Sequence, residues 1–464
     1  MLGTLSLIVY ASMLLVTLLV YQSKRRTFDS GTALLGSYFL YSVCSIVLYQ
    51  IQYYPFQEPT FLPFVYLYCM LMIAFYPVLR FRDTDVDTMS KPSHALLVPL
   101  CLVFVAAALV QLPETISAFS ENIVILLFLP TGGLDLYNDA MSDSYAIGDG
   151  SIANLPSIIT NAFGSFGVLL FFFYLTFKKR SLFLTIGLAT ACLIVVVQNI
   201  TLGQRGPIQE ALFTFFVTYL LLRKWLSPRI NRIIMVFGLG LATLVAVPLV
   251  LLTSSRFGDI GDGVFDSTIF YVGQQNLFFN NHGLDNNGLR YGDRTFPLFK
   301  TMLGFDDVPA NFMERRDKYP DLQINDEVFI GFVGDFALDF GPVIGALIIV
   351  VAVGAILLGT RIHRRRLLFH QLVLLHFALC VAMLGGIKLY PFSDVGGNLQ
   401  LILYICVYVL FWFDHHILRF GLQHPLSHGP ESHATSRMDD NRQTVTSDEF
   451  VTPSASFPTR PRTV

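Results

Sequence analysis

The short segment Gly203-Gln-Arg-Gly-Pro207 combines a guanidinium group with two glycines and a proline. The glycines permit a tight turn, and Pro207 suits the first turn of a helix that follows it. A helix N-terminus carries free N–H groups and a partial positive charge, and arginine binds phosphate oxygens through a bidentate fork. Arg205 is therefore the leading candidate for binding a diphosphate. The alternative is an interfacial arginine that reaches to water.

Further cations follow later in the chain. Arg290 and Arg294 are four residues apart, within a stretch whose glycines, Gly288 and Gly292, favour a loop over a helix. They are candidates for a second anion contact, and the alternative is solvated loop charge. Lys388 is a third candidate for contacting the same anion. Three more cations are interpreted as a mixed charged surface: Arg315, Arg316 and Lys318.

Proton transfer needs a base beside these cations. Glu210 follows Arg205 closely enough to pair with it, or it is a solvated acid near a helix end. His282 is the one histidine on the predicted outer side, where it is a candidate general base or an incidental loop residue. Asp339 is either a reacting carboxylate or a helix cap. The outer carboxylates that complete the set are Asp326, Glu327, Asp335 and Asp339.

The composition places these residues in a membrane protein. Of 464 residues, 53% are hydrophobic and only 14% are charged, whereas soluble domains average about 25% charged residues. The six cysteines lie in apolar runs and match no zinc spacing, so we interpret them as small buried hydrophobic residues. We expect no metal, no cofactor and no nucleic-acid partner.

Apolar runs near the ~20 residues needed to cross a bilayer predict an all-α polytopic protein of about eleven spans. The predicted spans are 3–21, 31–51, 61–79, 95–112, 156–177, 181–202, 207–226, 231–253, 341–360, 367–387 and 397–417. Residues 121–130 are too short to span, and they predict a separate interfacial or re-entrant helix. The stretch from Val328 to Phe340 is a candidate extension of the ninth span.

The loops divide the chain into four parts. Residues 1–253 hold spans one to eight, residues 254–340 form one large outer loop, residues 341–420 hold spans nine to eleven, and residues 421–464 form a disordered cytoplasmic tail. Because the loops 52–60 and 113–155 contain no Lys or Arg, the positive-inside rule places the N-terminus outside and the C-terminus in the cytoplasm. The basic residues left outside are Arg205, Arg256, Arg290, Arg294, Lys300, Arg315, Arg316, Lys318 and Lys388.

This layout resembles the O-antigen and capsule repeat-unit polymerases (Wzy-type) of bacterial polysaccharide assembly. The resemblance covers roughly residues 1–420. It rests on the number of spans, the Gly203-Gln-Arg-Gly206 turn, the late outer loop, and the segment from Asn325 to Gly341 that runs into a span. It implies a GT-C-like fold in the bacterial inner membrane.

The resemblance also implies the reaction. A growing glycan on undecaprenyl diphosphate would be transferred, without a metal, onto a lipid-linked repeat unit at the outer face. Arg205, Arg290, Arg294 and Lys388 would bind the diphosphates. The base would be His282 or a carboxylate among Glu210, Asp335 and Asp339. Membrane lipid, a chain-length regulator and a flippase of the same pathway are the implied partners.

Three alternatives remain. A GT-C mannosyltransferase of the usual kind would have paired acids in its first outer loop, and the loop 52–60 has one Glu, which counts against it. A glycan ligase would share the architecture and differ in its acceptor. A lipid-linked sugar flippase or another transporter would need charged groups along a path through the membrane, and few ionisable residues lie at mid-span, with His376 the clearest.

Overall fold

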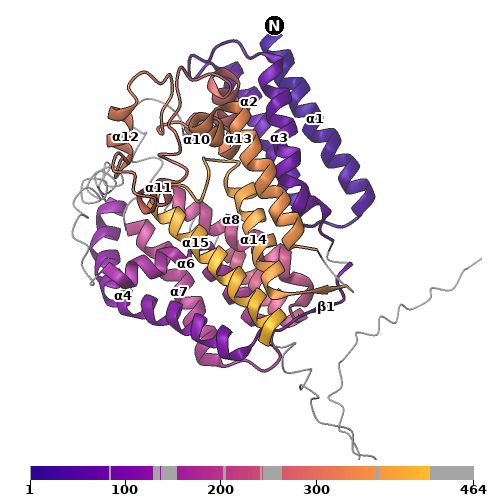
Figure 1. Ribbon diagram of the computed structural model, residues 1–464, viewed down its shortest axis with the longest axis vertical. Coiled ribbons are helices and arrows are strands. Elements are labelled where there is room, and N and C mark those ends of the chain that lie inside the picture. The colour runs from indigo at the N-terminus through magenta and orange to yellow at the C-terminus, as the bar shows by residue number, and fades with distance from the viewer. Residues whose placement is uncertain are drawn as a thin grey trace, which may run out of the picture. The chain divides into compact units, whose positions relative to one another are not determined.

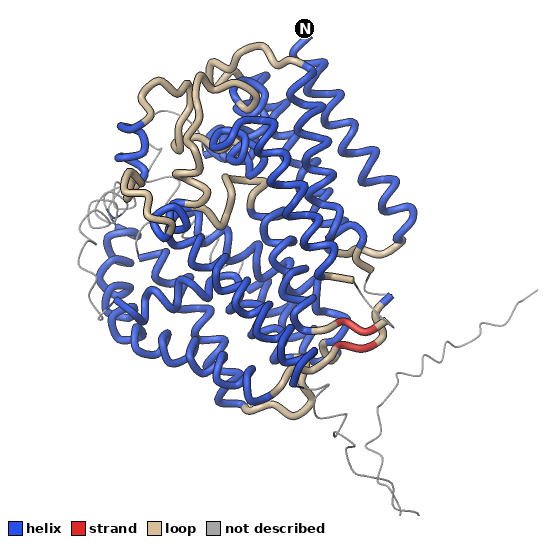
Figure 2. The backbone as a smooth tube through the Cα atoms, viewed as in Figure 1, coloured by secondary structure: helices blue, strands red, loops and turns tan. Residues whose placement is uncertain are grey.

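The computed structural model describes residues 2–82, 85–128, 136, 154–201, 205–240, 243, 264–361 and 365–418. The described part is almost entirely helical (Figures 1 and 2). Its first half contains α1 (Leu2–Arg25), α2 (Ser30–Ile51), α3 (Phe61–Arg80), α4 (His94–Phe128), α6 (Leu155–Leu175), α7 (Leu182–Thr201), α8 (Arg205–Leu222) and the 3-10 helix η3 (Arg223–Trp225). The rest contains α10 (Val264–His282), α11 (Pro297–Met302), α12 (Phe312–Lys318), α13 (Gly331–Gly359), α14 (Phe369–Leu384), α15 (Asp394–Phe413) and the π-helix η5 (Asp414–Leu418).

Eight of the described helices are long and apolar enough to cross a membrane: α1, α2, α3, α4, α6, α7, α13 and α15. The chain is therefore a polytopic α-helical membrane protein. α8 and α14 are shorter, at 18 and 16 residues. The predicted span 231–253 lies partly outside the described residues. Eleven spans and a GT-C-like fold remain predictions.

The fourth helix is longer than the sequence suggested. α4 runs without a break from His94 to Phe128, through Pro113. Residues 121–128 are thus its C-terminal continuation, and the prediction of a separate interfacial helix there is wrong. Apolar residues on both sides of Pro113 keep the helical pattern, and a proline can lie inside a membrane helix when neighbouring groups satisfy the freed backbone.

Residues 254–340 contain more helix than the prediction of one large loop implied. α10 packs along α2, where the Ser45 hydroxyl donates to the carbonyl of Gly273 over 2.7 Å. A side chain at Gly273 would collide with the backbone of Cys44, so glycine sets the close approach of the two helices. Residues 283–330 then form a layer of loops with the short helices α11 and α12 (Figure 2).

α13 begins before the predicted ninth span, as the proposed extension from Val328 to Phe340 anticipated. It starts at Gly331 and kinks at Gly341, whose φ is +80°, with Pro342 directly after the kink. Pro342 has no N–H to donate to the Leu338 carbonyl one turn earlier. The backbone N–H of Arg290 donates to that carbonyl instead, over 3.1 Å. The kink therefore attaches the loop layer to α13.

The other end of the helices carries the small parallel pair β1 (Thr88–Met89) and β2 (Arg366–Leu367), visible in Figure 2. Basic side chains bind backbone carbonyls there. Arg25 donates to the Phe81 carbonyl over 3.1 Å, and Lys224 donates to the Val86 carbonyl over 2.8 Å. This end and the loop layer lie at opposite ends of α13. Which end faces the cytoplasm remains a prediction.

Candidate functional site

The loop layer and the adjoining helices α13 and α15 together form a cluster of mostly buried charges, which we name the arginine cluster. Its members are Arg290, Arg294, Arg315, Asp326, Asp335, Asp339 and Asp394. Arg290 lies at its centre and is only 1% exposed. Its Nη2 lies 2.6 Å from Asp335 Oδ1, its Nε lies 2.6 Å from Asp339 Oδ1, and its Nη1 pairs with Asp326.

Asp335 and Asp339, the two aspartates on α13, both form ion pairs within this cluster. Asp335 and Asp339 are four residues apart, so they project from one face of the helix. Asp335 also accepts from Arg294 Nε and from the backbone N–H of Tyr390, over 3.1 and 3.0 Å. Asp339 accepts from the backbone and hydroxyl of Thr295 over 2.8 and 2.7 Å.

These contacts correct two sequence predictions. Asp339 does not cap a helix, because it lies inside α13 and its partners come from another segment. Asp335 and Asp339 are fully buried, so as they stand they offer no surface to an acceptor hydroxyl. Arg290 and Arg294 do lie in a loop, as their glycines predicted. Arg290 is enclosed by carboxylates, and its role as an anion contact stays a prediction.

Arg315 was interpreted as part of a charged surface, and this is wrong. It is 3% exposed, its Nε lies 2.5 Å from Asp326 Oδ2, and its Nη2 lies 3.1 Å from Asp394 Oδ1. Burial alone would raise the pKa of Asp326, but Arg294, Arg290 and Arg315 outweigh it and lower that pKa to about 2. Asp326 is therefore ionised at neutral pH.

A further buried carboxylate, Asp293, connects the short helices α11 and α12 to the turn between Arg290 and Arg294. Asp293 accepts from Lys318 Nζ over 2.8 Å and from the Tyr319 hydroxyl over 2.7 Å, and it also pairs with Lys300. These contacts fix α11 and α12 against the segment that carries Arg290 and Arg294. Arg316 lies outside this arrangement and pairs with Glu327, which is 60% exposed.

Lys388 lies apart from the arginine cluster's ion pairs, in the connection between α14 and α15. Its Nζ is 2.6 Å from Glu210 Oε1 in α8, and we name these two residues the Lys388 pair. A side chain at Gly206 would overlap Lys388 Nζ and would lie 3.8 Å from the Tyr271 hydroxyl. The lysine therefore rests against the first turn of α8. Lys388 and Glu210 remain 17% and 36% exposed, so this pair is accessible.

Glu210 contacts Lys388, and the predicted pairing of Glu210 with Arg205 involves a side chain outside the described part of the chain. Arg205 begins α8, but its side chain is outside the described part, as are residues 202–204. Burial alone would lower the pKa of Lys388, yet Glu210 raises it above the ordinary value of lysine. Lys388 is therefore a permanent cation at neutral pH.

Buried oxygens without a hydrogen-bond partner among the described residues occur on α8 and α10, the helices whose Gly206 and Tyr271 lie near Lys388. The side-chain oxygens of Gln209, Ser267 and Gln275 are buried and have no hydrogen-bond partner among the described residues. Gln209 adjoins Glu210 in α8. Ser267 and Gln275 lie one turn before and one turn after Tyr271 on α10, on the same face of the helix. Buried oxygens are normally paired, so a polar ligand is one way to satisfy these.

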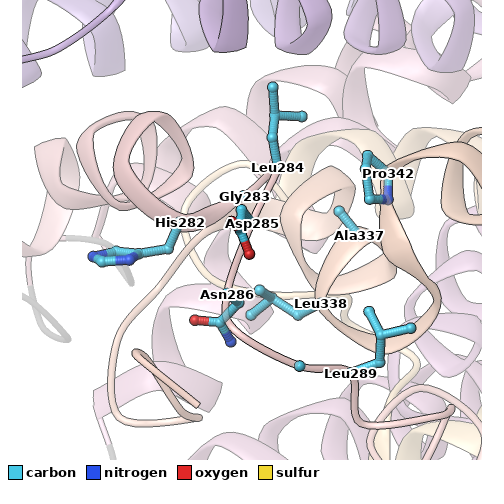
Figure 3. A pocket seen from close by; sticks show the side chains of 10 residues that line it. His282, Gly283, Leu284, Asp285, Asn286, Leu289, Ala337, Leu338 and Pro342 are labelled. Carbon is cyan, nitrogen blue, oxygen red and sulfur yellow. The ribbon is translucent and has the colours of Figure 1, made fainter. Parts of the chain in front are cut away.

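His282 is in a different place. Its Nδ1 lies 2.8 Å from Gln323 Oε1, and it lines a cavity of about 150 Å³ beside the kink of α13 (Figure 3). The lining residues are His282, Gly283, Leu284, Asp285, Asn286, Gly288, Leu289, Ala337, Leu338 and Pro342. The structure does not bring His282 to the Lys388 pair. The histidine predicted as a base and the lysine predicted to contact the anion therefore belong to separate contact networks.

Asp293 and Asp394 were not among the sequence candidates. Asp394 follows a serine just before the predicted eleventh span, which is the pattern of a helix start. That pattern has an ordinary structural explanation and gives no sign of an arginine partner. Within the described residues, no group of three or more His, Cys, Asp or Glu side chains could hold a metal ion.

The comparisons with known proteins give no match. No family model matches the chain, and no curated protein or solved structure is significantly similar to it.

Proposed function

We propose that the chain is a glycosyltransferase of the repeat-unit polymerase kind. It would transfer a growing glycan from undecaprenyl diphosphate to a lipid-linked repeat unit at the outer face of a bacterial inner membrane. The Lys388 pair is the observation that carries this proposal. It combines a cation, a carboxylate and a helix N-terminus at one accessible point beside apolar helices.

The chemistry requires the parts that meet there. The donor sugar is already activated by its diphosphate, so the reaction needs no nucleotide. The acceptor hydroxyl oxygen bonds to the anomeric carbon while the bond from that carbon to the phosphate oxygen breaks. The diphosphate leaves with the electron pair, and Lys388 stabilises its charge together with the α8 N-terminus.

The proton of the acceptor hydroxyl needs a base. Glu210 is the carboxylate nearest Lys388, and it is 36% exposed, whereas Asp335 and Asp339 are fully buried. We therefore assign the proton to Glu210. When the diphosphate binds Lys388, it competes with Glu210 for the ammonium group and releases the carboxylate to act.

The test is polymer formation in cells that make normal amounts of each variant. Each lost charge-assisted hydrogen bond is worth roughly 1.5–3 kcal/mol, so Lys388→Gln and Glu210→Gln should each lower polymer synthesis about 10-fold to 100-fold. Lipid-linked single repeat units should accumulate. Arg205→Lys should also impair synthesis, because it loses the planar fork. Arg316→Gln, which changes an exposed pair, is the control.

A normal polymer ladder in Lys388→Gln would contradict the proposal. If the variants still made polymer but no longer transferred glycan to another lipid acceptor, the result would favour a glycan ligase. Cysteine labelling tests the required orientation: positions 140 and 300 should react from outside and positions 180 and 363 from the cytoplasm. A cytoplasmic position 300 would place the whole site on the wrong face.

A further inference from the structure

The carboxylates of the arginine cluster differ sharply in exposure. The side chains of Asp326, Asp335 and Asp339 are 5%, 0% and 0% exposed, whereas that of Asp394 is 50% exposed. Three buried carboxylates already match the charge of the three arginines. Asp394 is therefore a fourth anion, and neutrality of the cluster does not require it.

Asp394 contacts two different arginines. Its Oδ2 is 3.3 Å from Arg294 Nη1 and its Oδ1 is 3.1 Å from Arg315 Nη2, distances similar to the 3.1 Å between Arg294 Nε and Asp335 and longer than the 2.6 Å at which Arg290 reaches Asp335 and Asp339. Each oxygen contacts a different guanidinium group, so the carboxylate bridges two segments. It is the counter-ion of this cluster that a solvent-borne anion can replace.

The backbone of Asp394 is in an unusual conformation. Its φ is +57°, in the left-handed region that residues with a side chain rarely adopt, and its N–H donates to the Arg294 carbonyl over 2.9 Å. Asp394 is the first residue of α15, at the end of the same connection that carries Lys388. A half-exposed carboxylate is thus held over the arginines at a conformational cost.

We propose that Arg294 and Arg315 form a phosphate-binding site that the Asp394 carboxylate covers and vacates when a phosphate group binds. Two oxygens of one phosphate can replace the two carboxylate oxygens on the two guanidinium groups. The inference rests on the proposed function only for the source of the ligand, which would then be the diphosphate of the lipid carrier. Phosphate binding itself is independent of glycan transfer.

Binding to the purified full-length protein tests this exchange. Inorganic pyrophosphate is titrated into the protein in neutral lipid nanodiscs by calorimetry, and undecaprenyl diphosphate in the same nanodiscs forms a second arm. Asp394→Asn removes the competing charge, so it should bind pyrophosphate about 10-fold to 100-fold more tightly than the wild type. Adding Arg315→Lys keeps the charge but loses the second contact, and it should abolish the gain.

Two variants keep the test decisive. Glu327→Gln removes an exposed carboxylate that pairs with Arg316, and it should leave the affinity unchanged. Asp394→Ser replaces Asp394→Asn if the latter unfolds. Tighter binding in the lipid arm alone would identify the lipid carrier as the ligand, and tighter binding of pyrophosphate would establish a general phosphate site.

Unchanged or weaker binding of both ligands by a folded Asp394 variant would overturn the proposal and leave Asp394 as a structural counter-ion. The outcome is separate from that of the proposed function. If Lys388→Gln still made polymer, tighter pyrophosphate binding by the Asp394 variant would still establish the phosphate site. If the Asp394 variant bound no more tightly, loss of polymer in Lys388→Gln would still support the proposed function.

Discussion

The arginine cluster and the Lys388 pair both combine cations with carboxylates, but they differ in burial and in the number of ion-pair partners. Arg290 is 1% exposed, and three carboxylates surround it. Lys388 and Glu210 form one ion pair with each other and remain 17% and 36% exposed. Buried ions need full pairing because their loss of hydration is costly, whereas an accessible pair can exchange its partner for a ligand. The buried part of the arginine cluster around Arg290 supports structure, whereas the Lys388 pair and the half-exposed Asp394 at the edge of the cluster suit ligand binding.

The largest expected effect comes from breaking the arginine cluster. Arg290→Met should lower the free energy of unfolding by about 3–5 kcal/mol, because it leaves the buried Asp339 without its arginine and removes one of the two arginines that contact Asp335. Thermal unfolding of the purified protein in detergent measures this. An unchanged unfolding temperature would show that the cluster is not structural, and the contrast with the Lys388 pair would fail.

Gly206→Ala tests the open pair without removing a charge. The added methyl group would overlap Lys388 Nζ, which is the end of a flexible side chain, so the lysine should move and the fold should persist. Polymer synthesis should fall about tenfold, the equivalent of roughly 1.4 kcal/mol.

Gly354→Ala is the matched control for this change. It lies in α13, and a side chain there meets nothing within 4 Å. Equal losses of polymer in both variants would argue that Gly206 matters for its backbone and not for the position of Lys388.

Asp326 makes the stability of the arginine cluster depend on pH. Its pKa is about 2 in the folded protein, below the ~3.9 of an unfolded aspartate, so ionisation stabilises the fold above pH ~4. That contribution, about 2 kcal/mol, should disappear as the pH falls from 4 to 2.

Asp326→Asn has no such titration. Unfolding temperatures of the wild type and this variant should therefore converge as the pH falls from 4 to 2. A constant difference across that range would mean that Asp326 does not titrate in this way.

The smallest effect is expected at the exposed edge. Arg316→Gln breaks a pair with a 60% exposed Glu327, and surface pairs contribute about 0–1 kcal/mol. Its unfolding temperature and polymer synthesis should stay near those of the wild type. A loss as large as that of Arg290→Met would show that exposure does not separate structural from peripheral pairs here.

The sequence alone determined most of the helical framework. Hydrophobic length is a local property, so the eight helices that can cross a membrane coincide with predicted spans, and the loop position of Arg290 and Arg294 followed from nearby glycines. The continuation of α4 through residues 121–128 was missed because Pro113 and a polar stretch resemble a boundary.

Only the tertiary structure decided which charges meet. Lys388 and Glu210 are 178 residues apart, and Arg294 and Asp394 are 100 residues apart. Hydropathy and spacing indicate that a residue is charged, but they do not show which distant residue faces it or whether water reaches it. Those depend on the packing of α8, α13 and the α14–α15 connection. The same packing made Arg315 a buried ion and left Glu210 accessible.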